Sequence, residues 1–109
     1  MIEIRRYVNR TGRDVFDDWL TQLADARAQA KIASRINRLA AGNFGDCKSL
    51  RQGLFELRID LGPGYRVYYA MIGRECVLLL CGGDKRKQSS DIERAFGYLK
   101  DYKERSGTS

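Results

Sequence analysis

The sequence predicts an α+β fold in which an antiparallel-dominated, twisted sheet packs against helices. Apolar residues recur with helical spacing in two segments near the start and in one near the end, and strand-like segments gather between them. Strands that gather in this way, instead of alternating with helices, are typical of antiparallel sheets. The expected order is β-α-α-β-β-β-α. A chain of 109 residues suits one domain over residues 1–109, with a frayed tail at about 105–109.

The first strand is expected at residues 2–8, IEIRRYV. The next helix is expected to open with a capping box, in which Thr11 is the N-cap and Asp14 reaches back. Its apolar face follows at helical spacing. The residues of this face are Val15, Phe16, Trp19, Leu20 and Leu23.

A second, alanine-rich helix is expected from about residue 25 to residue 41, because alanine favours helices and Gly42 follows as a natural stop. Its outer face carries four cations, which are Arg27, Lys31, Arg35 and Arg38. Two interpretations of this face stay open: a solvated surface, or a landing surface for an acidic partner or for nucleic acid. Residues 43–53 are expected to form a loop or a short turn.

The second half of the chain predicts a hairpin, a buried strand and a last helix. Residues 55–69 contain two alternating segments around Gly62-Pro63-Gly64. The apolar run CVLLLC at 76–81 fits a strand that is covered on both faces and is central in the sheet. GGDKRKQSS at 82–90 is expected to be a basic loop, and Ser90 with Glu93 is expected to cap the final helix.

The hairpin has one apolar and one polar face. The polar face consists of Glu56, Arg58, Asp60, Arg66 and Tyr68. For the apolar residues to share a face, the loop must have an odd length, because a slip by one residue turns every side chain over. A loop at 62–64 places Asp60 opposite Arg66, whereas a loop at 61–63 places Arg58 opposite Arg66. We favour the first register, because like charges directly opposed destabilise a sheet.

Either register places two arginines on one face, and further cations flank the hairpin. Lys48 and Arg51 precede it, and the basic segment at 85–87 follows the buried strand. Cations that converge from separate segments form an anion site. The alternative interpretation is a solvated face with surface ion pairs.

Composition narrows the function. The chain has no histidine, so the commonest acid/base group and the commonest zinc ligand are missing. The three cysteines have irregular spacing, which argues against a disulfide framework. No apolar run approaches the roughly 20 residues that span a bilayer, and the start does not resemble a signal peptide, so we expect a cytoplasmic location. The net charge of +6 suits phosphate backbones, anionic membranes or an acidic protein.

The run GLFELRIDLGPGYRVYYA, followed by VLLLCGGDKRKQSSDIERA, resembles the HigB-like branch of the RelE/ParE superfamily of toxins from bacterial type II toxin–antitoxin modules. This resemblance implies a compact RelE-like fold and an mRNA-cleaving toxin that often acts on ribosome-bound message. It also implies a small antitoxin, with a helix-turn-helix DNA-binding fold, that holds the toxin inactive. The basic sheet residues of the family correspond here to Arg58, Arg66 and Lys85, with Arg86 or Lys87 nearby.

These residues suit a metal-independent endoribonuclease without a cofactor, in which the 2′-OH of RNA attacks the adjacent phosphate in line. Arg58 and Arg66 would stabilise the transition state. Glu56 is the predicted base, with a plain ion pair to Arg58 or Arg66 as the alternative, and Lys85 is the predicted acid. The predicted RNA-binding residues are Lys48, Arg51, Tyr68, Arg86 and Lys87. Two alternatives stay open: a ParE-like inhibitor that binds DNA gyrase without catalysis, and a basic RNA-binding module that does not cleave.

Overall fold

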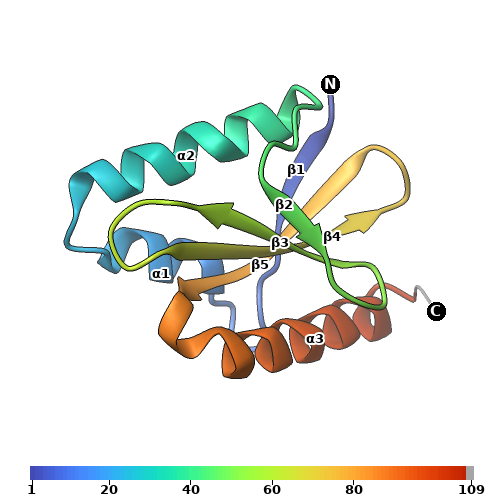
Figure 1. Ribbon diagram of the computed structural model, residues 1–109. Coiled ribbons are helices and arrows are strands. Elements are labelled where there is room, and N and C mark those ends of the chain that lie inside the picture. Colours follow the sequence, from blue (N-terminus) through green and yellow to red (C-terminus); the bar gives the residue numbers. More distant parts are fainter. Residues whose placement is uncertain (108–109) are drawn as a thin grey trace.

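The computed structural model describes residues 1–107 of the chain. Within them, a five-stranded mixed sheet lies between helices, which confirms the predicted α+β class (Figure 1). The elements are β1 (Glu3–Arg6), α1 (Val15–Gln22), α2 (Ala26–Ala40), β2 (Cys47–Ser49), β3 (Leu54–Ile59), β4 (Tyr65–Ile72), β5 (Cys76–Asp84), the 3-10 helix η1 (Lys85–Lys87) and α3 (Gln88–Arg105).

The strand order across the sheet is β1-β5-β4-β3-β2. β1 pairs with β5 in parallel, and the other three pairings are antiparallel. β5 is an interior strand whose residues from Cys76 to Gly83 are all buried, as its apolar run predicts. β2 lies where a loop was expected. Its three residues, CKS, carry no alternation that could reveal a strand, and pairing with β3 defines it.

The helices cover opposite faces of the sheet: α1 and α2 lie on one side and α3 on the other (Figure 1). On the first side, Phe16 of α1 and Ile32 and Leu39 of α2 pack on apolar residues of β3, β4 and β5. On the second side, Ala95 and Leu99 of α3 pack on a separate cluster of buried residues. The sheet therefore separates two cores, and the polar face of the hairpin lies on the α3 side.

Two adjacent glycines let the helices approach β5 closely. A Cβ on Gly82 would lie 2.3 Å from a ring carbon of Trp19, and a Cβ on Gly83 would lie 1.9 Å from Asp91 Oδ2. Both glycines are part of the strand, so the prediction that GGDKRKQSS forms a loop is wrong. The basic residues after it form η1, and α3 starts directly at Gln88.

The predicted helix caps also need correction. Asp14, not Thr11, caps α1, because its side chain accepts a hydrogen bond from the backbone N–H of Asp17 at 3.0 Å. Ser90 lies inside α3, where its hydroxyl donates to the carbonyl of Lys87. In both segments, the N-cap is therefore a different residue from the one that the capping-box pattern suggested.

The register of the hairpin differs from the one we favoured. Arg58 lies opposite Arg66, and Glu56 lies opposite Tyr68. The repulsion between the arginines is offset because the Glu56 carboxylate lies close to both of them. The predicted consequence of either register, that Arg58 and Arg66 share a face, is confirmed.

The C-terminal helix is tied to the start of the chain. Arg105 donates a hydrogen bond to the carbonyl of Val8 and pairs with Asp101, so α3 remains helical to Arg105. Residues 108–109 of the predicted frayed tail lie outside the described residues. Across residues 1–107, no helix combines the length and the apolar composition that crossing a membrane requires.

Candidate functional site

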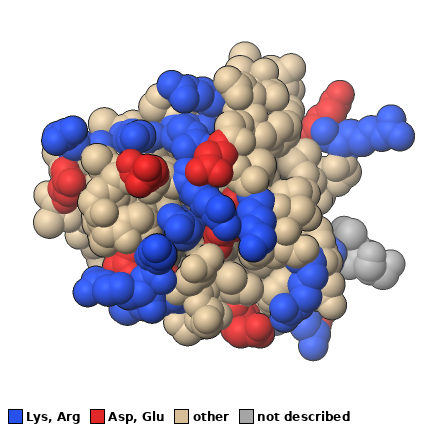
Figure 2. Space-filling model, in the orientation of Figure 1, with Lys and Arg blue, Asp and Glu red and all other residues tan. Residues whose placement is uncertain are grey.

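A polar pocket of about 290 Å³ lies where the β3–β4 loop meets the end of β5. It is lined by Asp46, Arg58, Asp60, Gly62, Pro63, Gly64, Arg66 and Lys85. The backbone N–H of Lys85 donates to the carbonyl of Gly64 at 2.8 Å, which holds the end of the strand against the loop. Figure 2 shows that Lys and Arg side chains gather in a band across this side of the molecule, with a few acidic side chains among them.

The two arginines of the pocket differ in exposure. The side chain of Arg58 is 36% exposed, whereas that of Arg66 is 13% exposed. Arg58 therefore presents its guanidinium to the solvent, and Arg66 lies behind it, where it also donates to the carbonyl of Tyr65. Because both side chains start from a rigid hairpin, their positive charges have fixed places in the pocket.

Glu56 forms ion pairs with both of these arginines. Its carboxylate accepts a hydrogen bond from Arg58 Nε at 3.0 Å and lies 3.8 Å from Arg66 Nε, within ion-pair range. Gln88, the first residue of α3, donates to its other oxygen at 2.7 Å. The side chain is completely buried. The predicted role of Glu56 as the base does not fit this position, because both oxygens are occupied and neither faces the solvent.

The strong contact with Glu56 also affects Arg58 directly. The pKa of Arg58 is raised, first by its hydrogen bond to Glu56 and further by the negative charges of Glu56 and Asp46. Arg58 therefore remains a cation at any pH at which the protein is folded. A permanent cation suits the binding of phosphate oxygens and excludes a role as an acid or base near neutral pH.

The basic segment 85–87 contributes one residue to the pocket. Lys85 lines it together with Arg58 and Arg66, as the sequence predicts. Arg86 instead pairs with Asp84 at 2.9 Å, and this hydrogen bond is the main reason why the pKa of Asp84 is lowered. Lys87 occupies the N-cap position of α3 and is exposed. Neither Arg86 nor Lys87 is part of the pocket lining.

The remaining predicted RNA-binding residues are dispersed. Lys48 is exposed on β2 opposite Glu56, one row away from the arginines. Arg51 turns toward α3, where its guanidinium lies 4.3 Å from the centre of the Phe96 ring and pairs with Glu93. Tyr68 is completely buried, so it has no open ring face on which a base could stack, and its assignment to RNA binding is corrected. Burial also raises the pKa of Tyr68.

Three residues of the site were missed by sequence reasoning. Asp46 lines the pocket from a segment that was expected to be a loop. Arg35 reaches from α2 to the carbonyls of Arg58 at 2.7 Å and Asp46 at 3.2 Å. Gln88 binds Glu56. A local pattern signals none of them, because each contact joins segments that are more than ten residues apart. Of the four cations predicted on the outer face of α2, Arg35 is thus committed to the sheet.

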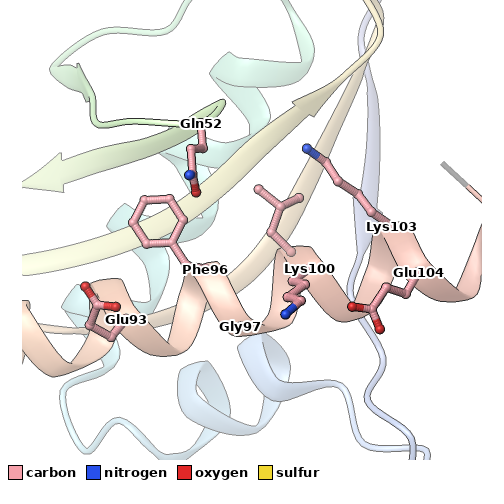
Figure 3. Close-up of a pocket in the computed structure, with 8 residues that line it drawn as sticks. Gln52, Glu93, Phe96, Gly97, Lys100, Lys103 and Glu104 are labelled. Atoms are coloured by element: carbon pink, nitrogen blue, oxygen red, sulfur yellow. The ribbon is translucent and has the colours of Figure 1, made fainter. Parts of the chain in front are cut away.

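A hollow larger than the polar pocket lies elsewhere in the described chain. It measures about 750 Å³ and lies between α3 and the turn that carries Gln52, toward which Phe96 points (Figure 3). Its lining is mostly apolar, and its charges are balanced between Lys100 and Lys103 on one side and Glu93 and Glu104 on the other. It contains none of the predicted site residues and no excess of positive charge, so the polar pocket stays the candidate site.

The fold and the pocket define a small α+β protein with a cationic site, and comparisons with known proteins place it in a family. Residues 18–97 match the family described as "Phage derived protein Gp49-like (DUF891)". A protein of Haemophilus influenzae described as "Uncharacterized protein" is 58% identical over 80 residues, which cover 73% of this chain and 81% of that protein. The chain belongs to the Gp49-like family, which is associated with the toxins of toxin–antitoxin modules.

This finding corrects the family that the resemblance suggested. The HigB-like branch of the RelE/ParE superfamily is not the family whose model matches the chain, so that assignment is wrong. The α+β fold, with its five-stranded mixed sheet and three helices, is not specific to the RelE-like order. The Gp49-like family does support one part of the expectation, namely a toxin that has an antitoxin as its partner.

Proposed function

We propose that this chain is the toxin of a toxin–antitoxin pair and that it cleaves RNA without a metal ion. The observation that carries the proposal is the pocket that Arg58, Arg66 and Lys85 line on one face of a rigid sheet. Three cations around one pocket suit a phosphodiester group. The net charge of +6 favours association with a nucleic acid in the same way.

The proposed reaction is the attack of a ribose 2′-OH on the adjacent phosphorus, with departure of the 5′-oxygen. Arg58, the more exposed arginine, binds the oxygens on which negative charge develops, and Arg66 adds positive charge from behind. Loss of one preorganised donor of this kind costs about 3–4 kcal/mol in the transition state. Lys85, which also lines the pocket, is the proposed donor of a proton to the leaving oxygen.

The proposed substrate is messenger RNA, and ribosome-bound message is the form to test first. A basic surface binds RNA through its phosphates. Sequence-specific RNA recognition mostly targets single-stranded segments, so we propose a single-stranded message as the substrate. The proposed partner is an antitoxin that blocks this pocket with acidic side chains. The acidic side chains of the antitoxin would compete directly with RNA for Arg58 and Lys85.

The test is to mix the purified protein with translating ribosomes and to map the ends of the message. We expect new ends with the wild-type protein and none with Arg58→Ala. Arg27→Ala is the matched control, because Arg27 is exposed on α2, outside the pocket, and should cut like the wild type. Intact message, together with growth arrest and an early stop of DNA synthesis, would favour an inhibitor of DNA gyrase. RNA that is bound but stays uncut would favour a binding module.

A further inference from the structure

We propose that Asp46 accepts the proton of the attacking 2′-OH, an inference that rests on the ribonuclease activity proposed above. Asp46 and Asp60 are the carboxylates among the residues that line the pocket beside Arg58, Arg66 and Lys85. Both are exposed. Across residues 1–107, neither carboxylate takes part in a hydrogen bond or an ion pair, so both keep free lone pairs for a substrate proton.

The other proton acceptors near the pocket are occupied or inaccessible. Glu56 is completely buried and bound to Arg58 and Gln88. Asp84 is paired with Arg86. Tyr68 is buried without access to the pocket surface. The chain has no histidine. A base must come within hydrogen-bond reach of the proton that it removes, and of the charged groups around this pocket the two exposed aspartates meet that condition.

The sheet places Asp46 next to Arg58. β2 and β3 pair with Cys47 opposite Leu57, so the next step of the same ladder brings Asp46 beside Arg58. The N–H of Arg58 donates to the carbonyl of Asp46 at 2.9 Å, which continues the pairing. Because side chains alternate along a strand, Asp46 belongs to the row that contains Arg58 and Arg66. A phosphate bound by the arginines would therefore have a carboxylate at its side.

The backbone of Asp46 is held from a second direction. Arg35 of α2 donates to the same carbonyl at 3.2 Å. The preceding Gly45 has a φ of +62°, which favours a glycine, and a Cβ there would lie 3.0 Å from Arg35 Nη2. Asp60, in contrast, follows the last paired residue of β3 and lies in the hairpin loop. A fixed backbone favours Asp46 over Asp60, because a general base must be positioned before the reaction.

The proton transfer balances with the rest of the reaction. The 2′-O–H bond breaks and its proton moves to a carboxylate oxygen of Asp46, while the 2′-oxygen forms a bond to phosphorus. The bond from phosphorus to the 5′-oxygen breaks, and that oxygen takes a proton from the ammonium of Lys85. The products are a 2′,3′-cyclic phosphate and a 5′-hydroxyl. Asp46 then loses its proton to water, and Lys85 regains one.

The test compares Asp46→Asn with Asp60→Asn in the full-length protein, on the RNA that the wild type cleaves. Both variants remove one negative charge from the same pocket and differ only in which carboxylate is lost. We expect Asp46→Asn to lower the cleavage rate by about 10²–10⁴-fold, the usual contribution of a general base, and Asp60→Asn to lower it by less than tenfold. A larger loss with Asp60→Asn than with Asp46→Asn would overturn the assignment.

Two further readouts separate a base from a structural residue. The charged groups that face Asp46 are Arg58 on β3, Arg66 on β4, Lys85 on η1, Arg35 on α2 and Asp60 in the loop. Cleavage by the wild type should fall on the acid side as the base is protonated, and Asp46→Asn should lack that fall. An RNA with a 2′-deoxy residue at the cleavage site should bind Asp46→Asn at least as tightly as the wild type. An unchanged pH profile, or weaker binding, would contradict the proposal.

The two proposals fail in distinguishable ways. If the wild-type protein leaves every message intact, the ribonuclease function is wrong. If the wild type cleaves and Asp46→Asn cleaves equally well, the ribonuclease function stands and the assignment of Asp46 is wrong. Thermal unfolding of both variants checks that neither has lost its fold, which is expected because both side chains are exposed.

Discussion

Glu56 shows how a single side chain organises the site. It is a buried carboxylate in a sheet, surrounded by two guanidinium groups and one amide. Burial of an ionised carboxylate is costly unless it is paired and hydrogen bonded, and here each oxygen has a partner. The geometry assigns Glu56 the part of a positioning residue, since it keeps two like charges side by side that would otherwise separate.

Replacement of Glu56 by glutamine should destabilise the protein. The variant leaves Arg66 as a nearly buried cation without a counter-ion, and removal of one partner of a buried pair typically costs about 3–5 kcal/mol. Arg58 can turn toward the solvent, so we expect the lower end of this range. Urea denaturation measures the loss.

Glu93→Gln is the matched control for Glu56→Gln, since Glu93 also pairs with an arginine, Arg51, but both side chains are exposed. Exposed pairs contribute about 0–1 kcal/mol. If both variants lowered the free energy of unfolding equally, the stabilising role of Glu56 would be refuted.

At the scale of the elements, two glycines determine how closely the helices lie on the sheet. Gly82 faces Trp19 of α1, and Gly83 faces Asp91 of α3, on opposite sides of β5. A side chain at either position would require the facing Trp19 or Asp91, or the helix that carries it, to shift. Gly83 is also the residue opposite Arg66. The packing of α3 on the sheet and the position of Arg66 therefore depend on the same short segment of β5.

Gly82→Ala should move α1 and leave α3 in place. The new methyl group would overlap the ring of Trp19, and overpacking of a well-packed core costs about 1–3 kcal/mol. Trp19 is the only tryptophan of the chain, so its fluorescence emission should change. Gly83→Ala is the control: it should destabilise the protein without a comparable change in emission, because its clash is with Asp91. Equal emission changes in both variants would contradict this arrangement.

A second contact between elements predicts a dependence on pH. Asp101 of α3 accepts a hydrogen bond from the hydroxyl of Tyr7, just after β1, at 2.6 Å, and this bond is the main reason why the pKa of Asp101 is lowered. A lowered pKa in the folded state stabilises the protein above the ordinary pKa of about 3.8, and this contribution is lost as the pH falls through the lower, folded value.

Tyr7→Phe should therefore reduce stability most at neutral pH. The pKa of Asp101 moves back toward its ordinary value without the hydroxyl, so the difference between variant and wild type should shrink as the pH falls below about 3.8. Denaturation curves of both proteins at a series of pH values measure this difference in the free energy of unfolding. A difference that stays constant from neutral pH into the acid range would show that Tyr7 acts through packing alone.

At the scale of the whole molecule, the charge of +6 is spread over the surface, and the pocket concentrates part of it. Figure 2 shows Lys and Arg side chains spread over this face of the molecule, and most cations of the chain do not line the pocket. Each phosphate contact releases condensed counterions, so the salt dependence of the binding constant counts such contacts. This dependence can therefore separate binding at the pocket from general attraction to a phosphate backbone.

Binding of a 2′-deoxy-substituted RNA should weaken as salt increases, and pocket variants should change the slope. For a single strand, each lost contact lowers the slope of log K against log salt by about 0.7. We expect this change for Arg58→Ala and for Lys85→Ala. Arg27→Ala, on the exposed face of α2, should leave the slope close to that of the wild type. Equal slopes for all three variants would place the RNA outside the pocket.

The sequence predicted the class of the fold and the faces of the hairpin because both depend on local patterns. Helical spacing marked α1, α2 and α3, and a period of two residues placed Arg58 and Arg66 on one face. The register was predicted wrongly because the pairwise repulsion of two arginines was considered without the carboxylate of Glu56 beside them. The likeness of short motifs also suggested a family that the comparison over residues 18–97 did not support.

What the sequence determined by itself is the order of the three helices and of the strands other than β2, the excess of positive charge and the shared face of the arginines. These properties follow from neighbours along the chain. The tertiary structure alone decided that Glu56 is buried, that Tyr68 is inaccessible, and that β2–β3 pairing places Asp46 beside Arg58, where Arg35 holds its carbonyl. Those properties arise where helices and strands that are distant in the chain exclude water between them, and a local pattern carries no record of such a contact.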